Sequence, residues 1–126
     1  MPNPKQHQEK AEHNRAFLGT ITEDVYSDWR ATITFYVAVH LVEKLRAYDG
    51  DHSQDHSERD RYVRGNHRAI YDSYRQLYSA SLEARYKSLH AFSISPADVK
   101  GVLIDVFLVE IERYVALETA SRTAGS

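Results

Sequence analysis

The segment over residues 28–48 constrains the fold of this chain more than any other. Large side chains recur in it at intervals of three and four, which predicts one amphipathic helix. The apolar arc is broad, so we expect neighbours on more than one side of this helix. Residues 49–51 end the pattern, and His40 falls within the core-facing stripe. That stripe consists of Trp29, Ile33, Tyr36, Val37, His40, Leu41 and Leu45.

The rest of the chain also predicts helices, and no stretch alternates as a strand would. Ser95 and Pro96 form a strong start signal, with Ser at the cap and Pro at the first helical position. The buried stripe predicted for the helix that follows consists of Val99, Val102, Leu103, Val106, Phe107, Glu110 or Ile111, Tyr114 and Leu117. The expected helices cover residues 5–18, 57–64, from 66 until the pattern fails near 88, and 96–118. The sequence therefore predicts an all-α fold, an antiparallel up-and-down bundle of four main helices with a short additional helix. We expect a single domain over 1–118 and a disordered tail over 119–126.

Composition excludes several classes of chemistry. The 126 residues contain no cysteine, so disulfides, thiolate nucleophiles, cysteine zinc sites and iron–sulfur clusters are ruled out. No apolar run is as long as a bilayer-spanning helix, so we expect no membrane partner. The N-terminus lacks the apolar region of a secretory signal. We therefore expect the protein to be cytoplasmic.

Charge is unevenly distributed along the chain. The formal net charge is −2, yet residues 59–90 hold seven Lys or Arg against three Asp or Glu, together with five of the nine tyrosines. Arginine interleaved with tyrosine suits phosphate neutralisation and base stacking. The alternative interpretation is a solvated helix face with tyrosine rings packed beneath it. The favoured partner in the first interpretation is RNA or a nucleotide.

The sequence offers little support for a metal or cofactor. His52 and His56 are four residues apart, which is a common ligand spacing, but they fall in a polar loop without an identifiable third ligand. Glu110 and Glu112 are two apart on a predicted helix and face different ways, so they make a poor acid–base pair. We therefore expect no metal and no cofactor.

Arg85 and His90 form the one arrangement that predicts catalysis. On a helix, or across its end, the two side chains could converge. Arginine is permanently charged and can hold a phosphate, while histidine can move a proton near neutral pH. Together they could cleave RNA without a metal, with the 2′-OH of the RNA as nucleophile. The same spacing also arises by chance in chains rich in both residues.

Several blocks of the sequence, in order, resemble prokaryotic proteins of the HEPN superfamily. The resemblance covers roughly residues 11 to 117, and its most specific part is DWRAT together with FYVAVHLV. In order, the resembling residues are Ala11, Asn14 and Phe17, then DWRAT (28–32), FYVAVHLV (35–42) and HSERDRYV (56–63), and last Tyr74, Leu77 and ARY (84–86). This resemblance implies an up-and-down helical bundle, in agreement with the periodicity.

The HEPN resemblance also implies functions. Some members are metal-independent endoribonucleases of defence and toxin–antitoxin systems that act as dimers, with an arginine followed at a short spacing by a histidine. Other members are non-catalytic partners of nucleotidyltransferases or bind nucleotides. In this chain the residue after Arg85 is Tyr86, where the ribonucleases usually carry Asn, Asp or His. The resemblance therefore implies a homodimer and leaves both classes of function open.

These considerations give a set of expected site residues. Arg85 and His90 are the candidate catalytic pair, and His56, Arg59 and Tyr86 are the candidate substrate-binding residues. We expect His56 and Arg59 to lie together in space, close to Arg85 or Tyr86. His40, Tyr36 and Asp28 are expected to be structural instead and to link buried helices by hydrogen bonds. The alternative function is an interaction module that pairs with a nucleotidyltransferase, an antitoxin or another partner protein.

Overall fold

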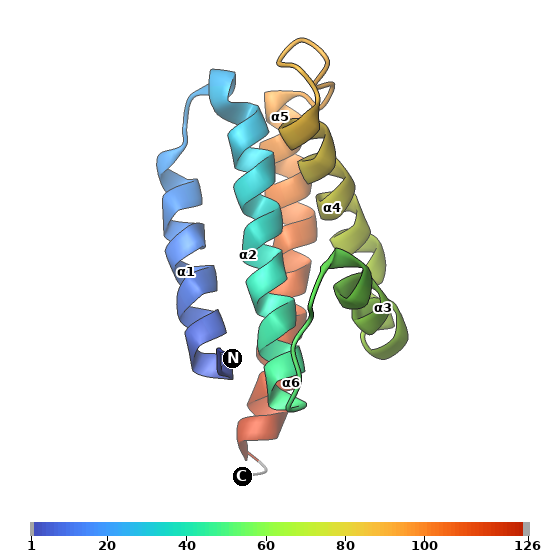
Figure 1. Cartoon of the computed structure of the whole chain (residues 1–126). Helices are drawn as coiled ribbons and strands as arrows, with labels where there is room; N and C mark the ends of the chain where they lie inside the picture. Colours follow the sequence, from blue (N-terminus) through green and yellow to red (C-terminus); the bar gives the residue numbers. More distant parts are fainter. Residues whose placement is uncertain (1, 125–126) are drawn as a thin grey trace.

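The computed structural model describes residues 2–124, and every regular element in that range is helical (Figure 1). The predicted all-α antiparallel bundle is therefore confirmed. Elements α5, η3 and α6 follow one another without a break and together are called the C-terminal helix. The elements are α1 (Pro4–Thr20), η1 (Asp24–Tyr26), α2 (Ser27–Tyr48), α3 (His56–Asn66), η2 (Arg68–Ile70), α4 (Tyr71–Tyr86), α5 (Pro96–Asp98), η3 (Val99–Leu108) and α6 (Val109–Ala124).

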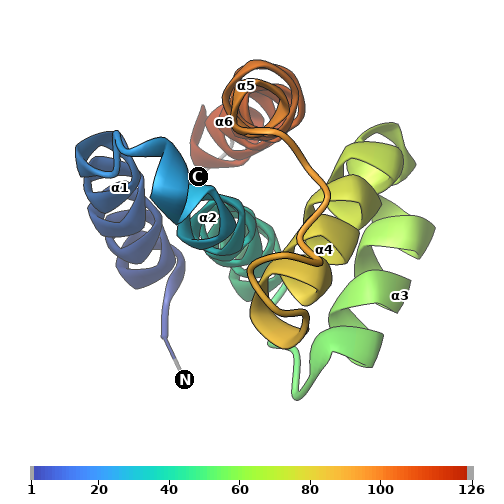
Figure 2. The same ribbon diagram turned by 90° about the horizontal axis from the view of Figure 1, so that it is seen from above.

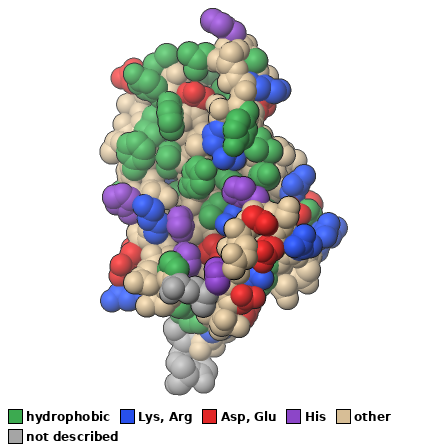
Figure 3. Space-filling model, viewed as in Figure 1, with side chains coloured by type: hydrophobic (Ala, Val, Ile, Leu, Met, Phe, Trp, Pro, Cys, Tyr) green, Lys and Arg blue, Asp and Glu red, His purple; other side chains and the backbone are tan. Residues whose placement is uncertain are grey.

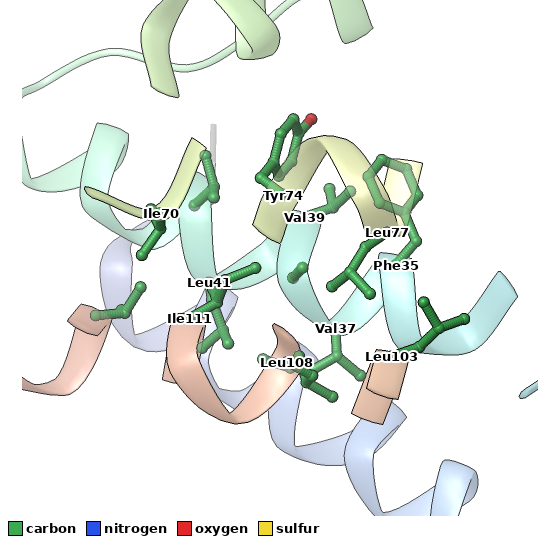
Figure 4. Packing of buried hydrophobic residues seen from close by; sticks show 14 of the residues in the cluster. Phe35, Val37, Val39, Leu41, Ile70, Tyr74, Leu77, Leu103, Leu108 and Ile111 are labelled. Atoms are coloured by element: carbon green, nitrogen blue, oxygen red, sulfur yellow. The ribbon is translucent and has the colours of Figure 1, made fainter. Parts of the chain in front are cut away.

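Helix α2 is the central element of the molecule. Seen from above, α1 lies on one side of α2 and α4 on the other, while the C-terminal helix packs across both α2 and α4 (Figure 2). The broad apolar arc of this helix explains the arrangement, because an arc of that width needs more than one neighbour. The core lies where α2, α4 and the C-terminal helix meet (Figure 4). Its labelled members include Phe35, Val37, Tyr74, Leu77, Leu108 and Ile111.

Side-chain caps set where three of the helices begin. The Asn3 side chain accepts a hydrogen bond from the backbone N–H of Gln6 and starts α1. The Ser95 side chain does the same for Asp98 at the start of the C-terminal helix. Asp55 caps α3 by accepting from the Glu58 N–H at 2.9 Å. Because Asp55 is the cap, α3 begins at His56, earlier than predicted.

The C-terminal helix departs from the predicted α-helix in its first part. Val99–Leu108 has π-helical hydrogen bonding, in which each N–H reaches back five residues. The buried positions consequently recur every four or five residues instead of every three or four. Ile104, absent from the predicted stripe, is only 4% exposed. Val102 and Val106 were predicted to be buried but are exposed.

The C-terminal helix also continues beyond the predicted end at residue 118. Thr119 is buried, and its hydroxyl donates to the Val115 carbonyl at 2.8 Å. Arg122 forms an ion pair with Asp49, which follows α2. These contacts attach the last turns to the bundle, so the expected tail over 119–126 is helical as far as Ala124. Residues 125–126 lie outside the described part of the chain.

The start of α2 differs from the prediction in its burial. Trp29 was predicted to face the core, but it is 57% exposed. It lies in the first turn of α2. Val25 and Tyr26 of η1 are exposed beside it in the sequence.

Among residues 2–124, no helix has the length and apolarity needed to cross a bilayer.

Candidate functional site

His56 stands at the first position of α3, where the Asp55 cap fixes the direction of the chain. Its ring is half-buried and packs against two aromatic rings from other helices. The ring centroid of Tyr78 lies 5.4 Å away in a stacked arrangement, and that of Phe35 lies 5.8 Å away. His56 is thus held by the core on one side rather than placed in a solvated loop.

Arg59 lies one turn further along α3 and joins His56 to a buried carboxylate. Its Nη1 contacts the Nδ1 of His56 at 2.8 Å, and its Nε donates to Glu43 Oε1 at 2.9 Å. The backbone N–H of Ser53 donates to the other oxygen of Glu43 at 3.2 Å. Burial alone would raise the pKa of Glu43, but the hydrogen bonds from Ser53 and Arg59 hold that pKa below its ordinary value.

The contact with Arg59 fixes the tautomer of His56. A guanidinium can only donate, so His56 Nδ1 must be the acceptor and the proton of the neutral ring sits on Nε2. Burial, followed by the charges of Arg59 and Arg85, lowers the pKa of His56, although Asp55 acts in the opposite direction. The ring is therefore neutral near pH 7 and presents an N–H donor, which suits hydrogen bonding to an oxyanion.

Arg85 occupies the last turn of α4 and is fixed by neutral groups. It donates to the Tyr36 hydroxyl at 3.2 Å, to the Ser81 carbonyl at 3.2 Å and to the Ser81 hydroxyl at 3.3 Å. Its guanidinium also lies 5.7 Å from the ring centroid of Tyr36 and 5.2 Å from that of Tyr86. No carboxylate of residues 2–124 forms an ion pair with Arg85. Its positive charge is therefore oriented but not neutralised.

A histidine pair between α1 and α2 adjoins Glu43 and Arg59. His7 Nδ1 and His40 Nδ1 are 3.2 Å apart, so one ring donates and the other accepts. Burial, and then the charges of His7 and its cationic neighbours, lowers the pKa of His40 to about 4. His40 thus links two helices by a hydrogen bond, as the sequence predicted. His7, His40, Glu43, His56, Arg59 and Arg85 are called the polar centre below.

The face drawn in Figure 3 carries both histidine and hydrophobic side chains. Histidine side chains gather across the middle of this face, and hydrophobic side chains cover much of its upper half.

Within residues 2–124, no group of three His, Asp or Glu side chains could hold a metal ion.

A pocket rich in arginine adjoins His56. It encloses about 300 Å³ between α3 and α4, and His56 and Tyr78 form part of its wall. Arg61 and Arg64 of α3 line it without an ion pair to any described carboxylate, and Arg75 of α4 pairs with Asp60 at 3.4 Å. The excess positive charge of residues 59–90 is thus gathered next to the polar centre.

The structure brings some of the expected site residues together and leaves one apart. His56 and Arg59 are in contact, and Arg85 is close enough to lower the pKa of His56. Tyr86 adjoins Arg85 and is 75% exposed. His90 is exposed in the turn that follows α4, and no hydrogen bond joins it to Arg85. Helix α4 ends at Tyr86, so Arg85 and His90 do not share one helical face.

Two members of the polar centre were not expected from the sequence. Glu43 lies one turn after His40 on α2, and a carboxylate in so apolar a helix is a signal of a buried partner. His7 lies in the weakly apolar first helix and carries no comparable signal. Its partner is 33 residues away in the chain, so only the packing of α1 on α2 reveals the pair.

No protein-family model, curated protein or solved structure matches this chain. The resemblance to the HEPN superfamily therefore remains a prediction from the sequence blocks. Some of the resembling blocks contribute residues to the polar centre: His40 from FYVAVHLV, His56 and Arg59 from HSERDRYV, and Arg85 from ARY. These four residues are neighbours in space.

Proposed function

We propose that this protein binds single-stranded RNA through the polar centre. The observation that carries the proposal is Arg85, a guanidinium that is fixed by Tyr36 and Ser81 and has no carboxylate partner among the described residues. A preoriented cation of this kind is suited to a phosphate group, which it can bind through two parallel hydrogen bonds. The neutral Nε2–H of His56 supplies a second donor nearby.

Two features favour a polynucleotide over a single nucleotide. The arginine pocket beside His56 offers Arg61 and Arg64 to a further phosphate. Tyr86 is exposed next to Arg85 and can stack on a base, which contributes about 1–3 kcal/mol per base in single-strand binders. A ligand that uses both features must carry more than one phosphate and an unpaired base.

Cleavage of the bound RNA is a further activity that the HEPN resemblance implies. The 2′-OH would attack the adjacent phosphorus, the bond to the 5′-oxygen would break, and a 2′,3′-cyclic phosphate and a free 5′-OH would result. The 2′-OH must lose a proton and the 5′-oxygen must gain one. Arg85 would hold the phosphate and His90 would transfer the proton. DNA would resist, because it lacks this nucleophile.

The test is a binding titration of labelled single-stranded RNA in EDTA, followed by fluorescence anisotropy. We expect Arg85→Gln to weaken binding by about tenfold or more, since a hydrogen bond to a charged group contributes about 1.5–3 kcal/mol. Arg113→Gln is the matched control, because Arg113 is exposed on α6 and does not belong to the polar centre. Equal binding by Arg85→Gln and wild type would contradict the proposal.

The same samples test cleavage. If His90 transfers the proton, His90→Ala should lose cleavage by about a hundredfold or more while still binding RNA. If His56 transfers the proton in place of His90, the loss of cleavage should appear in His56→Ala and not in His90→Ala. Binding without cleavage by the wild-type protein would restrict the function to RNA binding.

A second candidate function is non-catalytic pairing with a partner protein. The observation that favours it is the exposed group of Val25, Tyr26 and Trp29 at the start of α2, because exposed apolar side chains of this size often mark protein contacts. The partner would be a second copy of this chain, as in the predicted homodimer, or a nucleotidyltransferase or antitoxin as the resemblance implies. Light scattering on wild type and Trp29→Ser tests the homodimer, which predicts a dimer mass that Trp29→Ser lowers.

A further inference from the structure

Arg30 is an arginine buried without a counter-charge. The residue is only 9% exposed, and its Nε is buried without a hydrogen-bond partner. No carboxylate of residues 2–124 forms an ion pair with it. Arginine stays charged at all ordinary pH values, and its side chain is almost never buried unless it is paired. An anion bound beside Arg30 would neutralise this buried charge, and no carboxylate of the described chain does so.

Arg30 lines a cavity that is large enough for a small molecule. The cavity has a volume of about 510 Å³ and lies between the end of α1, the start of α2 and the start of the C-terminal helix. These three segments meet at one end of the bundle (Figure 1). Small-molecule sites typically enclose about 300–1,000 Å³. None of the residues that line this cavity belongs to the polar centre.

The other charged groups of the cavity leave Arg30 uncompensated. Arg15 is paired with Glu112 at 3.3 Å, and Lys100 is paired with Asp105 at 2.7 Å. Asp24 of η1 also lines the cavity but forms no ion pair with Arg30. An anion that enters would therefore meet one unpaired cation and two further cations already held by their own acids.

The rest of the wall is largely apolar. Leu18 and Ile21 contribute from the end of α1 and the turn after it, and Ile104 and Pro96 contribute from the C-terminal helix. A site that combines one unpaired cation with apolar walls suits a ligand with one anionic end and one apolar end. We propose that this cavity binds a small organic anion, with its carboxylate or phosphate on the Arg30 guanidinium and its apolar group against these side chains.

The experiment is a calorimetric titration with sodium hexanoate, using neutral hexanamide as the matched probe. We expect hexanoate to bind the wild-type protein and hexanamide to bind about tenfold more weakly or not at all. Hexyl phosphate, titrated in parallel, shows which head group the site prefers. Arg30→Met and Arg30→Gln should each weaken hexanoate binding by about tenfold or more, whereas the exposed Arg113→Met should leave it unchanged.

Thermal unfolding without ligand separates an anion site from a structural arginine. Methionine fills similar space without a charge, so Arg30→Met should raise the unfolding midpoint if Arg30 is an uncompensated buried cation. Asp24→Asn should strengthen hexanoate binding, because it removes the acid that competes for the cavity. The proposal would be overturned by unchanged hexanoate binding in both Arg30 variants. A lowered midpoint in Asp24→Asn would also overturn it, because Asp24 would then be the counter-charge of Arg30.

Discussion

At the scale of single residues, the polar centre depends on Glu43. This carboxylate neutralises Arg59, and Arg59 in turn donates to His56 and fixes its tautomer. Both side chains of the ion pair are largely buried. Glu43 therefore determines, through Arg59, which ring nitrogen of His56 carries the proton and can donate a hydrogen bond.

Removing the charge of Glu43 should therefore destabilise the fold. Glu43→Gln leaves Arg59 buried without a counter-charge, which costs about 3–5 kcal/mol when one partner of a buried pair is lost. Urea unfolding gives the free energy of unfolding, with Glu9→Gln as the exposed control on α1. A decrease no larger than that of Glu9→Gln would show that the Glu43–Arg59 pair is not needed for stability.

His40 should make stability depend on pH. Its pKa in the folded protein is about 4, against an ordinary value of 6.5. Between these values the unfolded chain binds more protons than the folded one, so the free energy of unfolding falls as the pH is lowered through this window. Above pH 6.5 the contribution of neutral His40 to the free energy of unfolding is fully present. Protonation would place a charge between α1 and α2, next to His7.

We expect the acid-induced loss of stability to be smaller in His40→Gln than in the wild-type protein. Urea unfolding at pH 6.5 and at about pH 4 measures it. His13→Gln is the control, because His13 is exposed on α1 and should leave the loss unchanged. The same loss in His40→Gln as in the wild type would contradict this account.

His56 and Arg59 were expected together because one block of the HEPN resemblance contains both. They are in contact because the Asp55 cap starts α3 at His56, and a spacing of three on a helix places both side chains on one face. Glu43 and His7 escaped prediction because their contacts join segments that are distant in the sequence. The role of His90 stays a prediction, because α4 ends at Tyr86 and helical spacing therefore does not decide where His90 lies relative to Arg85.

At the scale of the elements, caps and apolar spacing were sufficient to locate the helices. The Ser95–Pro96 signal begins the C-terminal helix where it was expected. The π-helical segment over 99–108 was not predictable, because its residues are apolar on nearly every side and several periods fit them. Only the packing against α2 and α4 decides which of them are buried.

A pair of substitutions distinguishes the π-helical register from an α-helical one. Ile104 is 4% exposed and Val106 is 50% exposed. Ile104→Ala should lower the free energy of unfolding by about 2–5 kcal/mol, whereas Val106→Ala should change it by about 0.5 kcal/mol or less. Urea unfolding of the two variants measures this difference. A larger loss in Val106→Ala would support the α-helical stripe predicted from the sequence.

At the scale of the whole molecule, two cationic regions are separate. The polar centre and its arginine pocket lie around α3 and α4, and the Arg30 cavity lies between α1 and the C-terminal helix. A protein with a net charge of −2 thus concentrates positive charge at two places. The first suits the phosphates of RNA, and the second suits one small anion.

The central claim is that RNA binds at the polar centre. Two-dimensional NMR of the histidine side chains tests it most directly, because His56 lies in the polar centre while His67 is buried among Tyr62 and Tyr114 elsewhere. We predict that a short single-stranded RNA shifts the signal of His56, raises its pKa and leaves His67 unchanged, and that Arg85→Gln abolishes the shift. RNA binding that leaves the His56 signal unchanged would contradict the account.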